Sequence, residues 1–201
     1  MSKGRLEAFS DCVFSIVATL LILDVHLPTG AGIDAASLRG LLPKVGVFLL
    51  SFVMVGMYWV AHHNMLHFVR QVDRNLLYLN LLLLLCVVFI PFPTSLLGAG
   101  LSNPLAVALY GGSLIATNLS GCLMWWYASS AGLLVESVAL SWSKKVLLLH
   151  AAPVPVYGLA ILLAGSYKLI SLLLFLVVPL FFIPPNPLLE RLLGNPGADR
   201  G

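Results

Sequence analysis

The sequence predicts an all-α membrane protein with six transmembrane helices per subunit. Of its 201 residues, 60% are hydrophobic and only 9% are charged, whereas about a quarter of the residues in a soluble domain carry a charge. Six apolar segments are long enough to cross a bilayer, and the basic residues are distributed unevenly among the segments that connect them. This composition excludes a soluble cytosolic enzyme and favours a multi-pass protein of the lipid bilayer.

The first apolar segment, residues 5–27, differs from the others because it carries carboxylates. Only 12 residues separate Asp11 from Asp24, which corresponds to about 18 Å of helix, less than the roughly 30 Å of a hydrocarbon core. At least one carboxylate therefore lies at membrane depth, where charges normally face protein or a water-filled path. We interpret this segment as a retained helix and not a signal peptide, because no small-residue cleavage site follows it.

Five further segments complete a six-helix transmembrane domain over residues 1–184, and residues 185–201 form a short cytoplasmic tail too small for a domain of its own. The sixth segment is the shortest. The five segments cover residues 45–68, 76–97, 104–127, 146–164 and 169–183.

The distribution of Lys and Arg predicts the orientation. With the N-terminus inside, the cytoplasmic parts hold eight basic residues and the opposite side holds three. This positive-inside bias places both termini in the cytoplasm. The eight are Lys3, Arg5, Arg70, Arg74, Lys144, Lys145, Arg191 and Arg200, and the three are Arg39, Lys44 and Lys168.

Prolines and cysteines within the apolar segments are both read as packing features. Pro91 and Pro153 are examples of prolines that remove a backbone donor in mid-segment. A kink is favoured over a hinge or a broken-helix ion site. Cys12, Cys86 and Cys122 lie in apolar segments, which predicts buried small side chains and no disulfide or zinc cluster.

One face of the first helix is aliphatic. At about 100° per residue, Ile16, Leu20 and Leu23 form a narrow stripe with Thr19 beside it, while Ser10 and Asp11 point away from it. From periodicity alone, such a stripe is more often a packing seam or a lipid-facing surface than the lining of a pore.

The histidines of the second helix do not predict a metal site. His63 and His67 are four residues apart, but no glutamate follows the first histidine as in the HExxH pattern, and no acidic or cysteine ligand is near in sequence. A hydrogen-bonding role for His62 or His63, with a possible pH sensitivity, is favoured. We find no nucleophile with a paired base, no phosphate-binding loop and no basic-aromatic patch, so we expect no enzyme activity, no cofactor and no nucleic-acid partner.

Motifs in the first three helices resemble a known family. The first helix begins with an RxxxFSD pattern made by Arg5, Phe9, Ser10 and Asp11. It is followed by Trp59, His62 and His63 on the second helix and by the run from Asn80 to Thr94 on the third. Together these are similar to the transmembrane protein 175 family of potassium-permeable channels, and the length fits its single-repeat prokaryotic members.

The resemblance implies a homotetramer around a central pore lined by the first helix of each subunit. It implies a hydrophobic constriction at Ile16, with Leu20 and Leu23 further along the stripe, a hydroxyl layer at Thr19, and Ser15 in the same region. The family lacks the TVGYG carbonyl filter of other potassium channels, and this sequence has no such motif. The expected function is therefore a potassium-permeable cation channel with modest K⁺ over Na⁺ selectivity, in the plasma membrane of a prokaryote.

We expect different roles for Asp24 and Asp11 of the first helix. Asp24, near the external end, either attracts cations at the outer mouth or is a solvated helix-end carboxylate. Asp11 belongs to a structural network with Arg5, Phe9, Ser10, Trp59, His62 and His63, and pairs with Arg5, a histidine or Trp59. The alternative function is a proton-coupled secondary transporter that uses Asp11 and the helix-two histidines, and a non-conducting scaffold is the third hypothesis.

Overall fold

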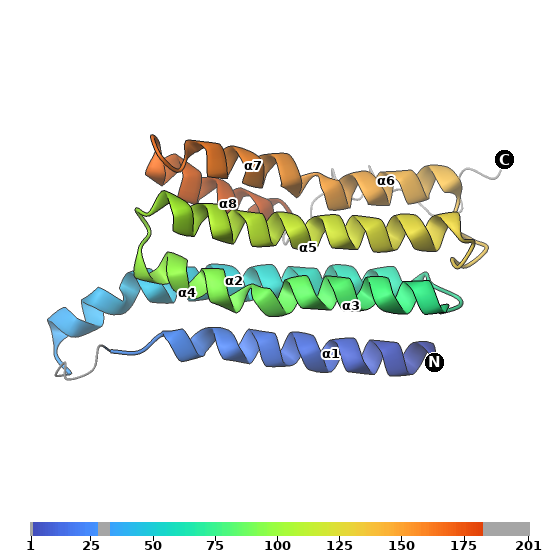
Figure 1. The fold of residues 1–201 in the computed structure, drawn as a ribbon, viewed down its shortest axis with the longest axis horizontal. Helices are drawn as coiled ribbons and strands as arrows, with labels where there is room; N and C mark the ends of the chain where they lie inside the picture. The colour runs from blue at the N-terminus through green and yellow to red at the C-terminus, as the bar shows by residue number, and fades with distance from the viewer. Residues whose placement is uncertain (1, 28–32, 183–201) are drawn as a thin grey trace.

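The computed structural model describes residues 2–27 and 33–182, and these residues fold into a helical bundle (Figure 1). The predicted tail, residues 185–201, lies outside the described residues. The elements are α1 (Lys3–Leu20), the 3₁₀ turn η1 (Leu21–Asp24), α2 (Ala35–His67), α3 (Arg74–Phe89), α4 (Pro91–Ala99), α5 (Pro104–Ser130), α6 (Leu140–Ala151), α7 (Pro153–Leu163) and α8 (Lys168–Phe182).

Within the described residues, five helical spans are long and apolar enough to cross a membrane, and α8 is a shorter apolar helix of 15 residues. Two of the five are pairs of helices joined end to end: α3 with α4 and α6 with α7. The joints are Ile90 and Ala152, which keep right-handed helical backbone angles immediately before Pro91 and Pro153. Because proline removes one backbone donor and clashes with the preceding turn, each helix is interrupted there while the chain keeps its direction.

Side-chain caps determine where three of the helices begin. Asp34 Oδ1 accepts a hydrogen bond from the Ser37 amide (2.7 Å), and Asp73 Oδ1 accepts one from the Leu76 amide (2.8 Å). Asn103 caps α5, whose first residue is Pro104. The cap at Asp34 explains why the second helix begins ten residues before the predicted position 45.

The core is centred on α5, which packs against α3, α4, α6 and α7. Tyr110, Leu114 and Trp125 of α5 are almost completely buried. The ring of Tyr110 meets Phe175 of α8 edge-on at 5.1 Å between centroids. At Gly111 a Cβ atom would lie 2.8 Å from Ile161 Cγ1, so the absence of a side chain allows α7 to approach α5 closely.

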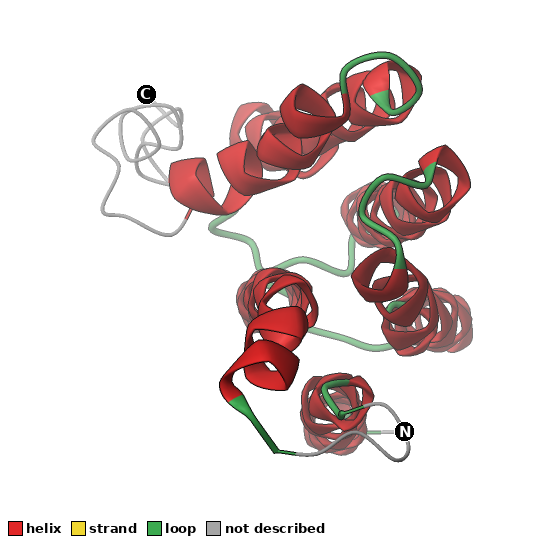
Figure 2. Ribbon diagram, turned by 90° about the vertical axis from the view of Figure 1, so that its left-hand side faces the viewer, coloured by secondary structure: helices red, strands yellow, loops and turns green. Residues whose placement is uncertain are grey.

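Helix α1 lies at the edge of the bundle, where it packs against α2 and α3 (Figures 1 and 2). One face is buried in these contacts, and the rest of its surface is left uncovered in the single chain. The buried residues of α1 and η1 are Leu6, Ser10, Phe14, Val17 and Leu21.

Candidate pore-lining helix

The predicted aliphatic stripe is the uncovered face of α1. The side chain of Ile16 is 57% exposed, that of Leu20 43% and that of Leu23 68%. Apolar side chains facing outward from a membrane helix contact either lipid or another subunit. The single chain therefore leaves this stripe free to contact lipid or another subunit.

The two hydroxyl groups beside the stripe are also exposed. Thr19 Oγ1 donates to the Ile16 carbonyl oxygen (2.8 Å), and Ser15 Oγ donates to the Asp11 carbonyl oxygen (2.8 Å). Because each hydroxyl hydrogen is used within the helix, the free lone pairs of the oxygen point outward as acceptors. Such oxygens can serve as partial ligands for a cation that passes along this face.

Asp11 points about 140° away from Ile16 around α1, and its carboxylate is held by α2. Trp59 Nε1 donates a hydrogen bond of 2.8 Å to Asp11 Oδ1. The ring of His63 lies against the Trp59 indole, with 5.9 Å between centroids. Among the described residues Asp11 forms no ion pair with Arg5, which is exposed near the start of the helix.

Ser10 joins a second, fully buried polar cluster that links three helices. Asn80 Nδ2 of α3 donates to Ser10 Oγ (3.1 Å), and Ser10 Oγ donates to the Leu6 carbonyl oxygen (2.9 Å). His62 Nε2 of α2 lies 2.7 Å from Asn80 Oδ1. Because an amide oxygen only accepts, the His62 Nε2 must be the donor, which defines the protonated nitrogen of this ring. All three side chains are thereby satisfied in the apolar core.

Sequence reasoning did not assign Asn80 to this cluster. It stands alone as a polar residue in the run LNLLLLLCVVF, and a lone amide inside an apolar membrane helix is a signal that it has a buried partner. Phe9 also departs from the expected network: it is 50% exposed and points away from Ser10.

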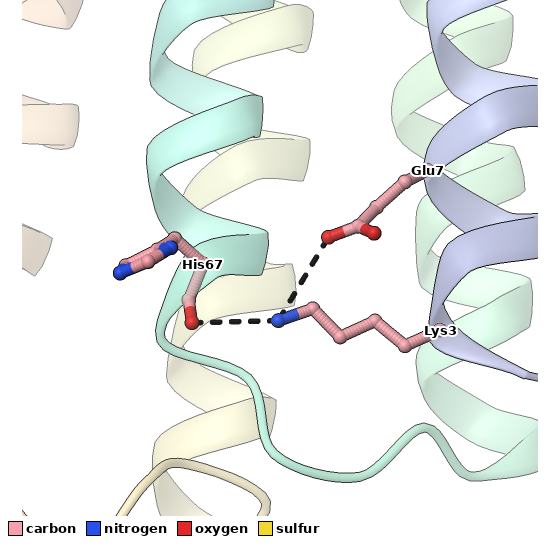
Figure 3. A network of polar contacts seen from close by, with 3 residues as sticks. All are labelled: Lys3, Glu7 and His67. Atoms are coloured by element: carbon pink, nitrogen blue, oxygen red, sulfur yellow. Dashed lines mark hydrogen bonds and ion pairs between the residues drawn. The ribbon is translucent and has the colours of Figure 1, made fainter.

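The two ends of the segment formed by α1 and η1 are bonded to different neighbours. At its start, Lys3 Nζ lies 3.4 Å from the His67 carbonyl oxygen and 3.8 Å from Glu7 Oε1 (Figure 3). This contact places a cation at the C-terminus of α2, where the helix dipole favours positive charge. At the other end, Asp24 Oδ1 accepts a hydrogen bond of 2.8 Å from Ser95 Oγ of α4, a partner that the sequence did not indicate.

No group of three or more His, Cys, Asp or Glu side chains suited to a metal ion exists in the part of the chain that the structure describes. The prediction that the three cysteines are buried is wrong for Cys12, which is exposed on α1, while Cys86 and Cys122 are partly buried.

Comparison with known proteins identifies the family. Residues 5–91 match the family described as endosomal/lysosomal potassium channel TMEM175. A protein of Streptomyces collinus named a potassium channel is 37% identical over 140 residues, which cover 67% of this chain and 68% of that protein. The chain belongs to the TMEM175 family.

Other relatives extend this result. A potassium channel of Chamaesiphon minutus is 37% identical over 143 residues, covering 68% of this chain and 70% of the relative. The human endosomal/lysosomal proton channel TMEM175 is 28% identical over 92% of this chain, which corresponds to 36% of the human protein.

A solved structure supports the fold. The crystal structure of a lysosomal potassium-selective channel TMEM175 homolog from Chamaesiphon minutus superimposes with a TM-score of 0.79 at 29% identity. The match covers 90% of this chain and 96% of that one. The TMEM175 fold therefore extends over α4 to α8, where sequence motifs gave no indication beyond hydropathy.

Proposed function

We propose that this TMEM175-family chain is the subunit of a potassium-permeable cation channel, in which four copies surround a central pore lined by α1. The observation that carries the proposal is the uncovered apolar stripe of Ile16, Leu20 and Leu23 on a helix whose other faces are anchored. The relatives named potassium channels support the choice of ion.

A ring of four Ile16 side chains forms the narrowest, driest layer of this pore. An ion that crosses an apolar ring loses water ligands without gaining others, so a closed ring is a dewetted barrier. Small movements of α1 that widen the ring admit water together with the ion. The polar contacts of Ser10 and Asp11 lie away from the stripe, so they hold the helix without obstructing the path.

Selectivity for K⁺ over Na⁺ is modest in this mechanism. K⁺ loses hydration more readily than Na⁺, which favours it at an apolar ring, and rings of Thr19 and Ser15 oxygens supply partial replacement ligands. The sequence contains no TVGYG segment, so no stack of backbone carbonyl sites is available to enforce strong discrimination.

The arrangement in the membrane follows from charge. Both termini face the cytoplasm of a prokaryotic cell, and Asp24 stands at the external end of the pore, where a ring of four carboxylates raises the local cation concentration. Its hydrogen bond with Ser95 holds each carboxylate against α4 of its own subunit.

The second candidate is a proton-coupled transporter that uses Asp11 and the histidines of α2. The occupied hydrogen bonds favour the channel, because Asp11 accepts from Trp59 and His62 is bonded to Asn80 inside the core. A transporter requires these groups to exchange protons with each aqueous side in turn.

Flux from proteoliposomes tests the proposal. Purified wild-type protein in K⁺ and Na⁺ gradients should release both ions, K⁺ the faster, with a rate that does not saturate with concentration as a carrier would. Protein-free vesicles are the control. Flux that saturates or requires a proton gradient would support the transporter, and the absence of flux from folded protein would contradict both.

A further inference from the structure

Phe9 lies on the open face of α1, although it belongs to the RxxxFSD pattern. Its neighbours Ser10 and Asp11 are held by α3 and α2, while the phenyl ring of Phe9 is 50% exposed. No contact with another aromatic ring is found for Phe9 within the described residues, whereas Phe14 of the same helix lies 5.5 Å from the His62 ring. The motif therefore contains one residue that points away from the polar network.

Helix geometry aligns Phe9 with the proposed pore stripe. Phe9 precedes Ile16 by seven residues, a rotation within about 20° of two full turns and a rise of roughly 10 Å. Leu23 follows Ile16 by the same interval, and the structure exposes all three side chains. The apolar stripe thus extends from Phe9 to Leu23, with Ile16 at its centre.

We propose that Phe9 forms a second constriction of the conduit, on the side of Ile16 nearer the N-terminus. The inference rests on the proposed tetrameric channel. A phenyl ring reaches further from the helix axis than the side chain of isoleucine, so four Phe9 rings also leave a narrow, apolar opening where the helices lie somewhat further apart than at Ile16. Water and ions passing through the conduit then cross two dry layers, one at Phe9 and one at Ile16.

Cys12 provides a reporter for the space between these two layers. It is exposed on α1, and it points within about 40° of Ile16 at roughly 4 to 6 Å of helix rise from each ring. The other two cysteines are partly buried in α3 and α5. A reagent that reaches Cys12 from the N-terminal side must pass Phe9, and one from the opposite side must pass Ile16.

The experiment measures how fast Cys12 reacts in the full-length channel. In a Cys86→Ala/Cys122→Ala background, a membrane-impermeant, positively charged methanethiosulfonate is applied to each face of excised patches, and the decline of K⁺ current is timed. Phe9→Ala should accelerate the reaction about tenfold from the N-terminal face only, equivalent to removing roughly 1.4 kcal/mol of barrier. Ile16→Ala should accelerate it from the opposite face only.

Phe92→Ala is the matched control, because Phe92 of α4 is a phenylalanine of similar exposure, 54%, on another helix. Its reaction rates should equal those of the background protein. If Phe9→Ala does not assemble, Phe9→Leu provides the same comparison with a smaller rate increase.

The outcomes separate this inference from the proposed function. Unchanged rates in the Phe9 variants, with the Ile16→Ala effect present, would overturn the Phe9 constriction and leave the channel intact. Reaction of Cys12 without any effect on current in all variants would show that α1 does not line the conduit, which contradicts both.

Discussion

Trp59 Nε1 donates a 2.8 Å hydrogen bond to Asp11 Oδ1 and thereby joins the C-terminal part of α2 to the first helix. Both side chains stand on the side of α1 away from Ile16. The contact sets the rotation of α1 about its own axis, and that rotation determines which side chains face outward. This polar contact therefore helps to orient the apolar stripe.

Replacement of Asp11 by Asn should leave a conducting channel. The Asn carbonyl oxygen can still accept from Trp59, so the orientation of α1 is retained while the titratable group is lost. K⁺ flux from proteoliposomes measures the result, and Trp59→Phe, which removes the donor, should reduce the yield of folded protein. Abolition of flux by Asp11→Asn in a protein of normal yield would favour the transporter.

Asn80→Leu should destabilise the subunit. The substitution leaves the buried His62 Nε2–H without its acceptor, which costs about 1 to 3 kcal/mol. It also removes the donor to Ser10 Oγ, which keeps its own hydrogen bond to the Leu6 carbonyl oxygen. Asn64→Leu is the matched control, because Asn64 lies on the neighbouring helix α2 and is exposed. Thermal unfolding in detergent should show a lower midpoint for the Asn80 variant than for the Asn64 variant. Equal midpoints would show that the buried cluster contributes little.

Gly111→Ala should lower the stability of the fold, and Gly112→Ala should raise it. At Gly111 the new methyl group meets Ile161 Cγ1 at 2.8 Å and Phe175 Cζ at 3.3 Å, while nothing lies within 4 Å of the methyl group at Gly112. Overpacking costs about 1 to 3 kcal/mol, whereas alanine in an open helix position gains up to about 1 kcal/mol over glycine. The same unfolding assay distinguishes them, and a stabilised Gly111 variant would contradict the packing of α5 against α7.

Acid should weaken the cap of α3. Hydrogen bonds from the Tyr127 hydroxyl and the Leu76 amide hold the pKa of Asp73 below its ordinary value. A carboxyl group whose pKa is lower in the folded state stabilises the fold above its unfolded pKa, and this contribution is lost as the pH falls through the folded value, below about 4. Asp73→Asn should show a smaller loss of thermal stability over that range than wild type. An identical pH dependence for both proteins would exclude Asp73 as the source of the stability lost in acid.

Much of the fold could be predicted because a membrane-spanning helix is recognised from the length and hydropathy of one continuous segment. Residues 104–127 were expected to form a helix, and α5 begins at Pro104, directly after its Asn103 cap. The predicted second helix begins at residue 45 and is too short, because α2 begins ten residues earlier, beyond Lys44 and Arg39, at its Asp34 cap. Charged residues are tolerated there because long side chains reach the interface.

Contacts between helices could not be predicted in the same way. Periodicity shows that Asp11 points away from the stripe, but Trp59, His62 and His63 are all within about one turn of α2. The position of α1 along the axis of α2 decides which of these three side chains contacts Asp11. Asn80 and Ser10 are 70 positions apart, and their contact depends on how α1 and α3 pack together.

The most direct test of the account is ion flux through an Ile16→Asn channel. An amide ring at the constriction retains water where isoleucine excludes it, so K⁺ flux should rise and the preference for K⁺ over Na⁺ should weaken. Ile22→Asn is the control, because Ile22 is the same residue type with 46% exposure and points roughly 120° away from the stripe. Equal flux and selectivity in wild-type and Ile16→Asn proteoliposomes would contradict the assignment of α1 as the lining of the pore.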